Sequence, residues 1–112
     1  MSVYPSGLPK NTHRIIDRVI IATSTTQSNG IEIGGASSGQ IFSPITGSIA
    51  FESSPDGNNW WPVYDAGTAT TISATANRCY AIPSSAIQGK YMRVVVPAQG
   101  ADLEIQFVLK GV

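Results

Sequence analysis

The sequence predicts an all-β protein: an antiparallel β-sandwich, jelly-roll or immunoglobulin-like, with about 8–9 short strands behind an extended N-terminal arm. Short runs of alternating apolar and polar residues recur along the 112-residue chain, which is the pattern of strands with one buried face. Gly, Pro, Asn and Ser separate these runs at intervals of roughly 8 to 12 residues. No stretch sustains a helical period. Strand order stays open, and a galactose-binding-like order is a further alternative.

The chain divides into an N-terminal arm, residues 1–13, and a sandwich domain, residues 14–112. Pro5 and Pro9 prevent regular structure in the arm, because proline has no amide hydrogen and biases the preceding residue toward extended geometry. The arm also has too few apolar residues to fold alone. We therefore expect it to become ordered only against another subunit.

A mild basic cluster marks the passage from the arm into the first strand. It consists of Lys10, His13, Arg14 and Arg18, offset by Asp17. Two interpretations stay open for these residues. They could form a solvated strand entry, or they could dock the arm on an acidic neighbour, since little else in the sequence would order the segment.

The expected strands follow the arm in order, each a short run rich in β-branched or aromatic residues. They are RVIIATST, GIEIGG, GQIFSP, GSIAFESS, WWPVYD, TATTISA, RCYAIP, KYMRVVVP and DLEIQFVLK. The last has the clearest alternation, and with GSIAFESS it predicts a common core of Leu103, Ile105, Phe107, Ile49 and Phe51. The segment PSSAIQG could hold one helical turn capped by Ser84 or Ser85.

A tight turn followed by two adjacent tryptophans occupies the middle of the chain, in FESSPDGNNWWPVYD. Pro55 presets the backbone of a hairpin turn and Gly57 can adopt the left-handed conformation that closes it. Because neighbouring strand residues point to opposite faces, Trp60 and Trp61 cannot both enter one core. Trp61 has the parity of Val63, so we expect Trp61 in the core and Trp60 with Tyr64 on a contact surface.

Charge and composition exclude several classes of partner. Seven basic residues balance seven acidic ones, and charged residues make up 12% of the chain, so nothing directs it to nucleic acid or to an acidic membrane. No run approaches the roughly 20 apolar residues of a membrane span, and the N-terminus lacks the apolar run of a signal peptide. We expect a soluble protein synthesised in the cytoplasm. A surface so poor in charge is often covered by a partner.

The sequence lacks the sets of residues that the common catalytic and metal-binding sites require. His13 is the only histidine and Cys79 the only cysteine, so no zinc site with ordinary ligand spacing and no Ser-His-Asp set can be drawn. The glycines of GGASSGQ match neither phosphate-binding motif. Cys79 is expected to be a small buried strand residue. We expect no enzyme, no cofactor and no metal.

The hairpin FESSPDGNNWWPVYD, the later GKYMRVVVP and the terminal LEIQFVLK together resemble small β-sandwich proteins of tailed-bacteriophage virions, including capsid decoration, or cement, proteins. The resemblance covers residues 47–109. It implies a structural protein on the capsid surface, with the major capsid protein as partner and a symmetric homo-oligomer, by analogy a trimer. It carries no catalytic residues, and the arm has no counterpart.

A carbohydrate- or receptor-binding module of a phage tail or fibre is the main alternative. The S-P-D-G-x-x-W hairpin also occurs in carbohydrate-binding and fibronectin-like domains. In this alternative, the exposed tryptophan and Tyr64 would stack on a sugar ring. Asp56, Asn58 and Asn59 would then bond its hydroxyl groups.

Overall fold

A computed structural model describes residues 14–34 and 36–111 and confirms the predicted all-β antiparallel sandwich. One sheet has four strands in the order β1-β11-β3-β9, and every neighbouring pair is antiparallel. Strands β1 and β11 pair over eight successive residues. The bounds are Arg14–Ile21 for β1, Leu103–Gly111 for β11, Ala36–Ser43 for β3 and Arg78–Ala81 for β9.

The second sheet has five strands in the order β2-β10-β4-β5, with β8 also paired to β4. Strand β4 is central: β10 pairs along one edge, while β8 and β5 share the other edge. A separate two-stranded ribbon joins β6 to β7. The bounds are Ile31–Glu32 for β2, Gly47–Ser54 for β4, Trp61–Pro62 for β5, Tyr64–Asp65 for β6, Thr68–Ala69 for β7, Thr71–Ala74 for β8 and Tyr91–Val95 for β10.

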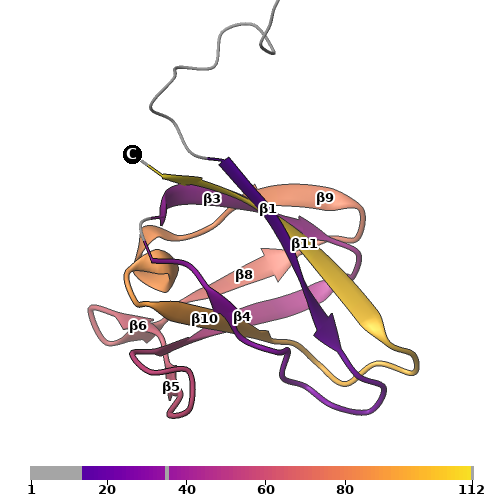
Figure 1. Ribbon diagram of the computed structural model, residues 1–112. Helices are drawn as coiled ribbons and strands as arrows, with labels where there is room; N and C mark the ends of the chain where they lie inside the picture. Colours follow the sequence, from indigo (N-terminus) through magenta and orange to yellow (C-terminus); the bar gives the residue numbers. More distant parts are fainter. Residues whose placement is uncertain (1–13, 35, 112) are drawn as a thin grey trace, which may run out of the picture.

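The strand order resolves the alternatives that the sequence leaves open. If the short excursion β5-β6-β7 is set aside, successive strands alternate between the two sheets (Figure 1), except that β4 and β8 pair within one sheet. One sheet then reads β1-β11-β3-β9 and the other β2-β10-β4-β8, with the first strand beside the last. This interleaving is the jelly roll, an architecture of two packed antiparallel sheets.

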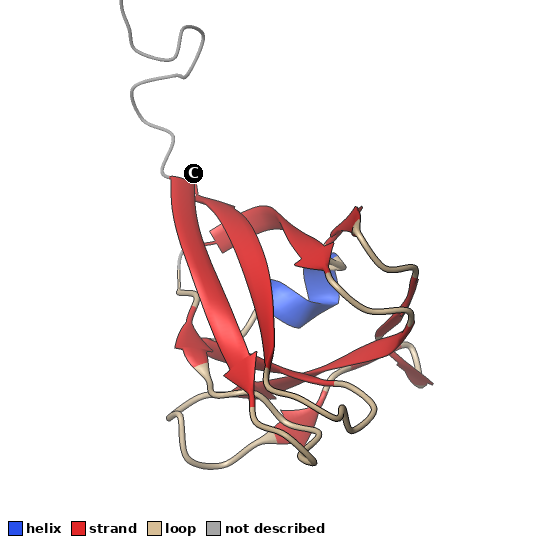
Figure 2. Cartoon of the chain, turned by 90° about the vertical axis from the view of Figure 1, so that its right-hand side faces the viewer, coloured by secondary structure: helices blue, strands red, loops and turns tan. Residues whose placement is uncertain are grey.

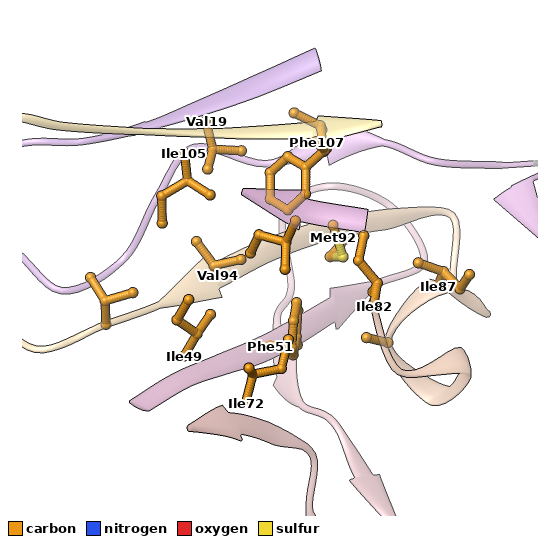
Figure 3. Packing of buried hydrophobic residues seen from close by; sticks show 14 of the residues in the cluster. Val19, Ile49, Phe51, Ile72, Ile82, Ile87, Met92, Val94, Ile105 and Phe107 are labelled. Carbon is orange, nitrogen blue, oxygen red and sulfur yellow. The ribbon is translucent and has the colours of Figure 1, made fainter. Parts of the chain in front are cut away.

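The core fills the space between the two sheets, which Figure 2 shows from the side and Figure 3 at close range. All five predicted core residues face it. Ile49, Phe51, Ile105 and Phe107 are buried, and Leu103 is partly buried against the same cluster. In β11 the buried residues alternate with exposed Glu104 and Gln106, because successive side chains of a strand point to opposite faces.

Three local predictions need correction. Strands β1 and β3 begin earlier than predicted, at Arg14 and Ala36. The predicted strands WWPVYD and TATTISA are both divided, the first between β5 and β6 and the second between β7 and β8. The helical turn exists as a 3₁₀ helix over Ser84–Ile87, yet no side chain caps it, and Pro83 holds the N-cap position. The predicted arm, residues 1–13, lies outside the described residues.

Candidate binding surfaces

A network of hydrogen bonds holds the turn between β4 and β5. The Asp56 Oδ1 atom accepts from the amides of Asn58, at 2.8 Å, and Asn59, at 2.9 Å. It also accepts from the Ser54 hydroxyl, which in turn accepts from the amide of Gly57 at 2.8 Å. Gly57 has φ +81°, a left-handed conformation that glycine adopts without steric cost. The predicted Pro-Asp-Gly hairpin is therefore confirmed.

The same hydrogen bonds lower the pKa of Asp56 well below its ordinary value. The largest cause is the Asn59 amide, followed by the Asn58 amide, the Asn59 side chain and Ser54. Each donor favours the ionised carboxylate over the neutral acid. Asn59 Nδ2 donates to the second carboxylate oxygen at 2.9 Å. Asp56 and Asn59 thus bond each other within the turn, which leaves them less able to bind the hydroxyls of a sugar.

Trp60 packs on the outer face of the five-stranded sheet and is half-buried. The Arg93 guanidinium lies 4.6 Å from its ring centroid, within the range of a cation–π contact. Arg93 Nε also donates to Glu52 Oε1 at 2.6 Å, and both of these side chains are mostly shielded from solvent. A Cβ built on Gly30 would approach the Trp60 ring to 2.6 Å. Trp60 therefore has a packing role in this face.

The expectation that Trp61 belongs to the core is wrong: its side chain is 57% exposed. Its parity is as predicted, because Trp61 pairs with Ser53, which pairs on its other side with the fully buried Met92. All three share the core-facing side of the sheet. Strand β5 lies at the periphery of that sheet, however (Figure 1), so the opposing sheet does not cover Trp61.

Tyr64 is 60% exposed and begins β6, so it is available for contact as predicted. Trp60 is less available, because Arg93 and Gly30 occupy its surroundings. Along the chain, the buried Val63 stands between Trp60 and Tyr64. The Val63 amide donates to the Phe51 carbonyl at 3.0 Å. The strongly exposed aromatic residues of this part of the chain are therefore Trp61 and Tyr64.

The predicted basic cluster is described only in part. Lys10 and His13 lie outside the described residues. The backbone of Arg14 opens β1 opposite Lys110. Arg18 is exposed and contacts Glu104 Oε1 at 3.4 Å. The docking role of the arm therefore stays a prediction.

The outer face of the four-stranded sheet is a surface that the sequence analysis missed. Phe42 is 40% exposed there, directly paired to Cys79 in β9 and to Gln106 in β11. Cys79 is exposed, which corrects the prediction that it is buried. The missed signal is the alternation in β3, where Ile41 and Ser43 face the core and Phe42 must therefore face outward.

The described part of the chain has neither a metal-binding cluster nor a membrane-spanning helix. Among residues 14–34 and 36–111, no group of three or more His, Cys, Asp and Glu side chains converges as a metal ion would require. No helix in the same ranges is long and apolar enough to cross a membrane.

Neither a protein-family model nor a curated protein sequence matches the chain. Among solved structures, it is similar in fold to the SPBc2 prophage-derived protein YomS, with a TM-score of 0.61 and 8% sequence identity. The match covers 93% of this chain and 98% of that one. Peruvianin-I, a cysteine peptidase from Thevetia peruviana latex, gives a TM-score of 0.38 at 13% identity, over 87% of this chain and 48% of that one. The YomS match establishes a shared fold, and the peptidase match is too weak to carry an argument.

Proposed function

We propose that this chain is a non-enzymatic structural protein of a tailed-bacteriophage virion, of the capsid decoration type. The observation that carries the proposal is the shared fold with a prophage-derived protein over nearly the full length of both chains. The hairpin that resembles phage virion proteins forms as the sequence predicts, with Asp56 and Gly57 in the turn. The jelly roll is also used by viral capsid domains.

Such a protein would act by binding the outer surface of the capsid shell and bridging its subunits. It needs a rigid body and contact surfaces with little charge, and it needs no active site. Many copies on a closed shell convert weak individual contacts into firm attachment through avidity. If the protein binds the intact shell but not the dissociated subunits, its binding stabilises the shell by mass action. A symmetric homo-oligomer, by analogy a trimer, belongs to the same proposal.

Co-sedimentation with shells tests this function. The chain would be mixed with empty shells assembled from the major capsid protein of the same genome. We expect saturable co-sedimentation and a higher disruption temperature of the decorated shells. Unassembled capsid protein is the control for contacts that exist only in the shell. A chain that stays in the supernatant at saturating concentration would show that the proposed function is wrong.

Carbohydrate binding is the second candidate, favoured by the exposure of both Trp61 and Tyr64. Aromatic faces exposed beside a turn can stack on a sugar ring, and jelly rolls also occur among lectins. The internal bonds of Asp56 and Asn59 count against it. A glycan array would decide: binding that is lost in both Trp61→Ala and Tyr64→Ala would favour this candidate over decoration.

A further inference from the structure

The outer face of the four-stranded sheet has an uncharged centre. Two rows of side chains cross β11, β3 and β9 in register. Gln106, Phe42 and Cys79 form one row, and Val108, Gln40 and Ala81 form the next. All are exposed except Val108, which is half-buried. An aromatic ring without charged residues beside it fits the centre of a protein–protein interface, where aromatic residues are enriched and most charged residues are depleted.

Charged residues lie around this centre, and most are basic. Arg18 on β1, Arg78 at the start of β9 and Lys110 near the end of β11 are exposed. Glu104, in contact with Arg18, is acidic, and the exposed Asp102 directly precedes β11. The other sheet, its hairpin and the β6-β7 ribbon carry acidic Glu32, Glu52, Asp56 and Asp65 against basic Lys90 and Arg93. The described side chains around the first face are thus three basic and two acidic, whereas the second group has two basic and four acidic.

Two hollows flank the central residues on this face. One, of about 480 Å³, is lined by Phe42, Pro44, Arg78, Cys79, Glu104 and Gln106, with Ser43 and Asn77. The other, of about 350 Å³, is lined by Ser38, Gly39, Gln40, Ala81, Val108 and Lys110. Both have apolar lining residues and one basic side chain, and the first also has the acidic Glu104. They can accept protruding side chains of a partner.

We propose that this face, defined by Phe42, Cys79, Gln40, Ala81, Gln106 and Val108 with its basic rim, docks on an acidic protein surface of the capsid shell. The inference rests on the proposed function and adds the contact face and the charge of the partner. Opposite charges at the rim would select and orient the partner, while the uncharged centre is desolvated.

A second copy fits this face less well, because two basic rims would oppose each other. Nucleic acid also fits less well, because phosphate recognition requires basic groups across the contact area and here the centre is uncharged.

The area of this face agrees with attachment in many copies. Three strands of eight or nine residues and one of four residues, about 4.8 Å apart, span roughly 450 Å². This is below the roughly 800 Å² per partner of a stable one-to-one complex, so firm attachment would depend on avidity.

Cys79 provides a direct probe, because it is exposed beside Phe42 on the edge strand β9 of this face and is the only cysteine in the chain. The full-length protein would be labelled with a maleimide, free and bound to empty shells of the same phage. We expect rapid labelling of the free protein and loss of labelling in the bound protein. The matched control combines Cys79→Ala with Ser73→Cys, on the exposed outer side of β8, and should label equally well in both states.

Charge variants test the same face by affinity. Phe42→Glu and Lys110→Glu should each weaken shell binding by about tenfold or more, because each introduces a negative charge against an acidic partner. Thr71→Glu and Lys90→Glu make the same changes on the opposite sheet and should bind as the unmodified protein does. Binding should also weaken as salt rises, because salt screens the exposed rim charges. Circular dichroism would verify that each variant folds.

The outcomes separate the two proposals. If the unmodified protein does not bind shells, the proposed function fails and this inference fails with it. If it binds, yet Cys79 stays reactive and Phe42→Glu binds normally, only the docking face is wrong. A dimer in light scattering that Phe42→Glu abolishes would assign the face to a second copy. Duplex DNA binding that Lys110→Glu abolishes would assign it to nucleic acid. Either result would overturn the inference.

Discussion

Phe107 and Phe42 lie on adjacent strands and have opposite roles. Phe107 is fully buried between the sheets (Figure 3), and Phe42 is 40% exposed on the outside. Phe107→Ala should lower the free energy of unfolding by about 3–5 kcal/mol, because it removes packed volume and leaves a cavity. Phe42→Ala should cost much less. Urea denaturation of both variants would measure this difference, and equal losses would contradict the assignment of the two faces.

Substitution of the two tryptophans should also change stability by different amounts. The sequence predicts the larger loss for Trp61→Ala, whereas the structure predicts it for Trp60→Ala. Trp60→Ala should lower stability by about 1–3 kcal/mol, because it removes half-buried area and the contact with Arg93. Trp61→Ala should change stability by no more than about 0.5 kcal/mol, since its side chain is exposed. Thermal denaturation of the two variants would measure the difference. A larger loss for Trp61→Ala would restore the original prediction.

At the scale of elements, the turn between β4 and β5 depends on one glycine. Gly57 has φ +81°, and a Cβ there would meet Tyr91 only at an ordinary 3.7 Å. Gly57→Ala should therefore destabilise the protein by about 1–2 kcal/mol through backbone strain, without a steric clash. Gly100→Ala is the matched control, because a Cβ there meets nothing within 4 Å. Similar denaturation midpoints for both variants would show that the turn tolerates a side chain.

The carboxylates of Asp56 and Asp102 accept hydrogen bonds in the folded protein and make its stability depend on pH. The pKa of Asp56 and that of Asp102 both lie below the ordinary value of 3.8, Asp102 chiefly because the amide and hydroxyl of Thr23 donate to it. A lowered folded-state pKa gives stability that is fully present above the unfolded value, near pH 4, and is lost as pH falls through the folded value.

Denaturation midpoints measured between pH 6 and pH 2 would test this dependence. The unmodified protein should lose stability below about pH 4. Asp56→Asn should be less stable near neutral pH and should lose less on acidification, because its side chain does not titrate in this range. Parallel curves for the two proteins would show that Asp56 contributes nothing to the acid sensitivity.

At the scale of the whole molecule, the buried hydrophobic residues of the described chain run from Val19 to Leu109. Deletion of residues 1–13 should therefore leave the melting temperature of the β-sandwich nearly unchanged. It should weaken attachment or oligomerisation, as expected of an arm that orders against another subunit. Calorimetry and shell co-sedimentation of the truncated chain would measure both effects. Unfolding of the truncated chain would place the arm in the core and contradict this prediction.

The sequence by itself determined the features that depend on neighbouring residues. Alternation located most of the strands and assigned Ile49, Phe51, Ile105 and Phe107 to the core, because the direction of a strand side chain follows from its parity. The Pro-Asp-Gly turn was predictable because its geometry is set within four residues. The resemblance of the hairpin to phage proteins was also visible at this level.

Only the tertiary structure decided which strands are neighbours and which faces are covered. The jelly-roll order depends on pairings such as β1 with β11, between segments at opposite ends of the chain, which no local pattern encodes. Trp61 has the parity of a core residue yet is exposed, because burial also requires an opposing sheet. Phe42 and Cys79 form one surface only because β3 pairs with β9. Parity is a local property, whereas coverage and adjacency depend on the packing of distant segments.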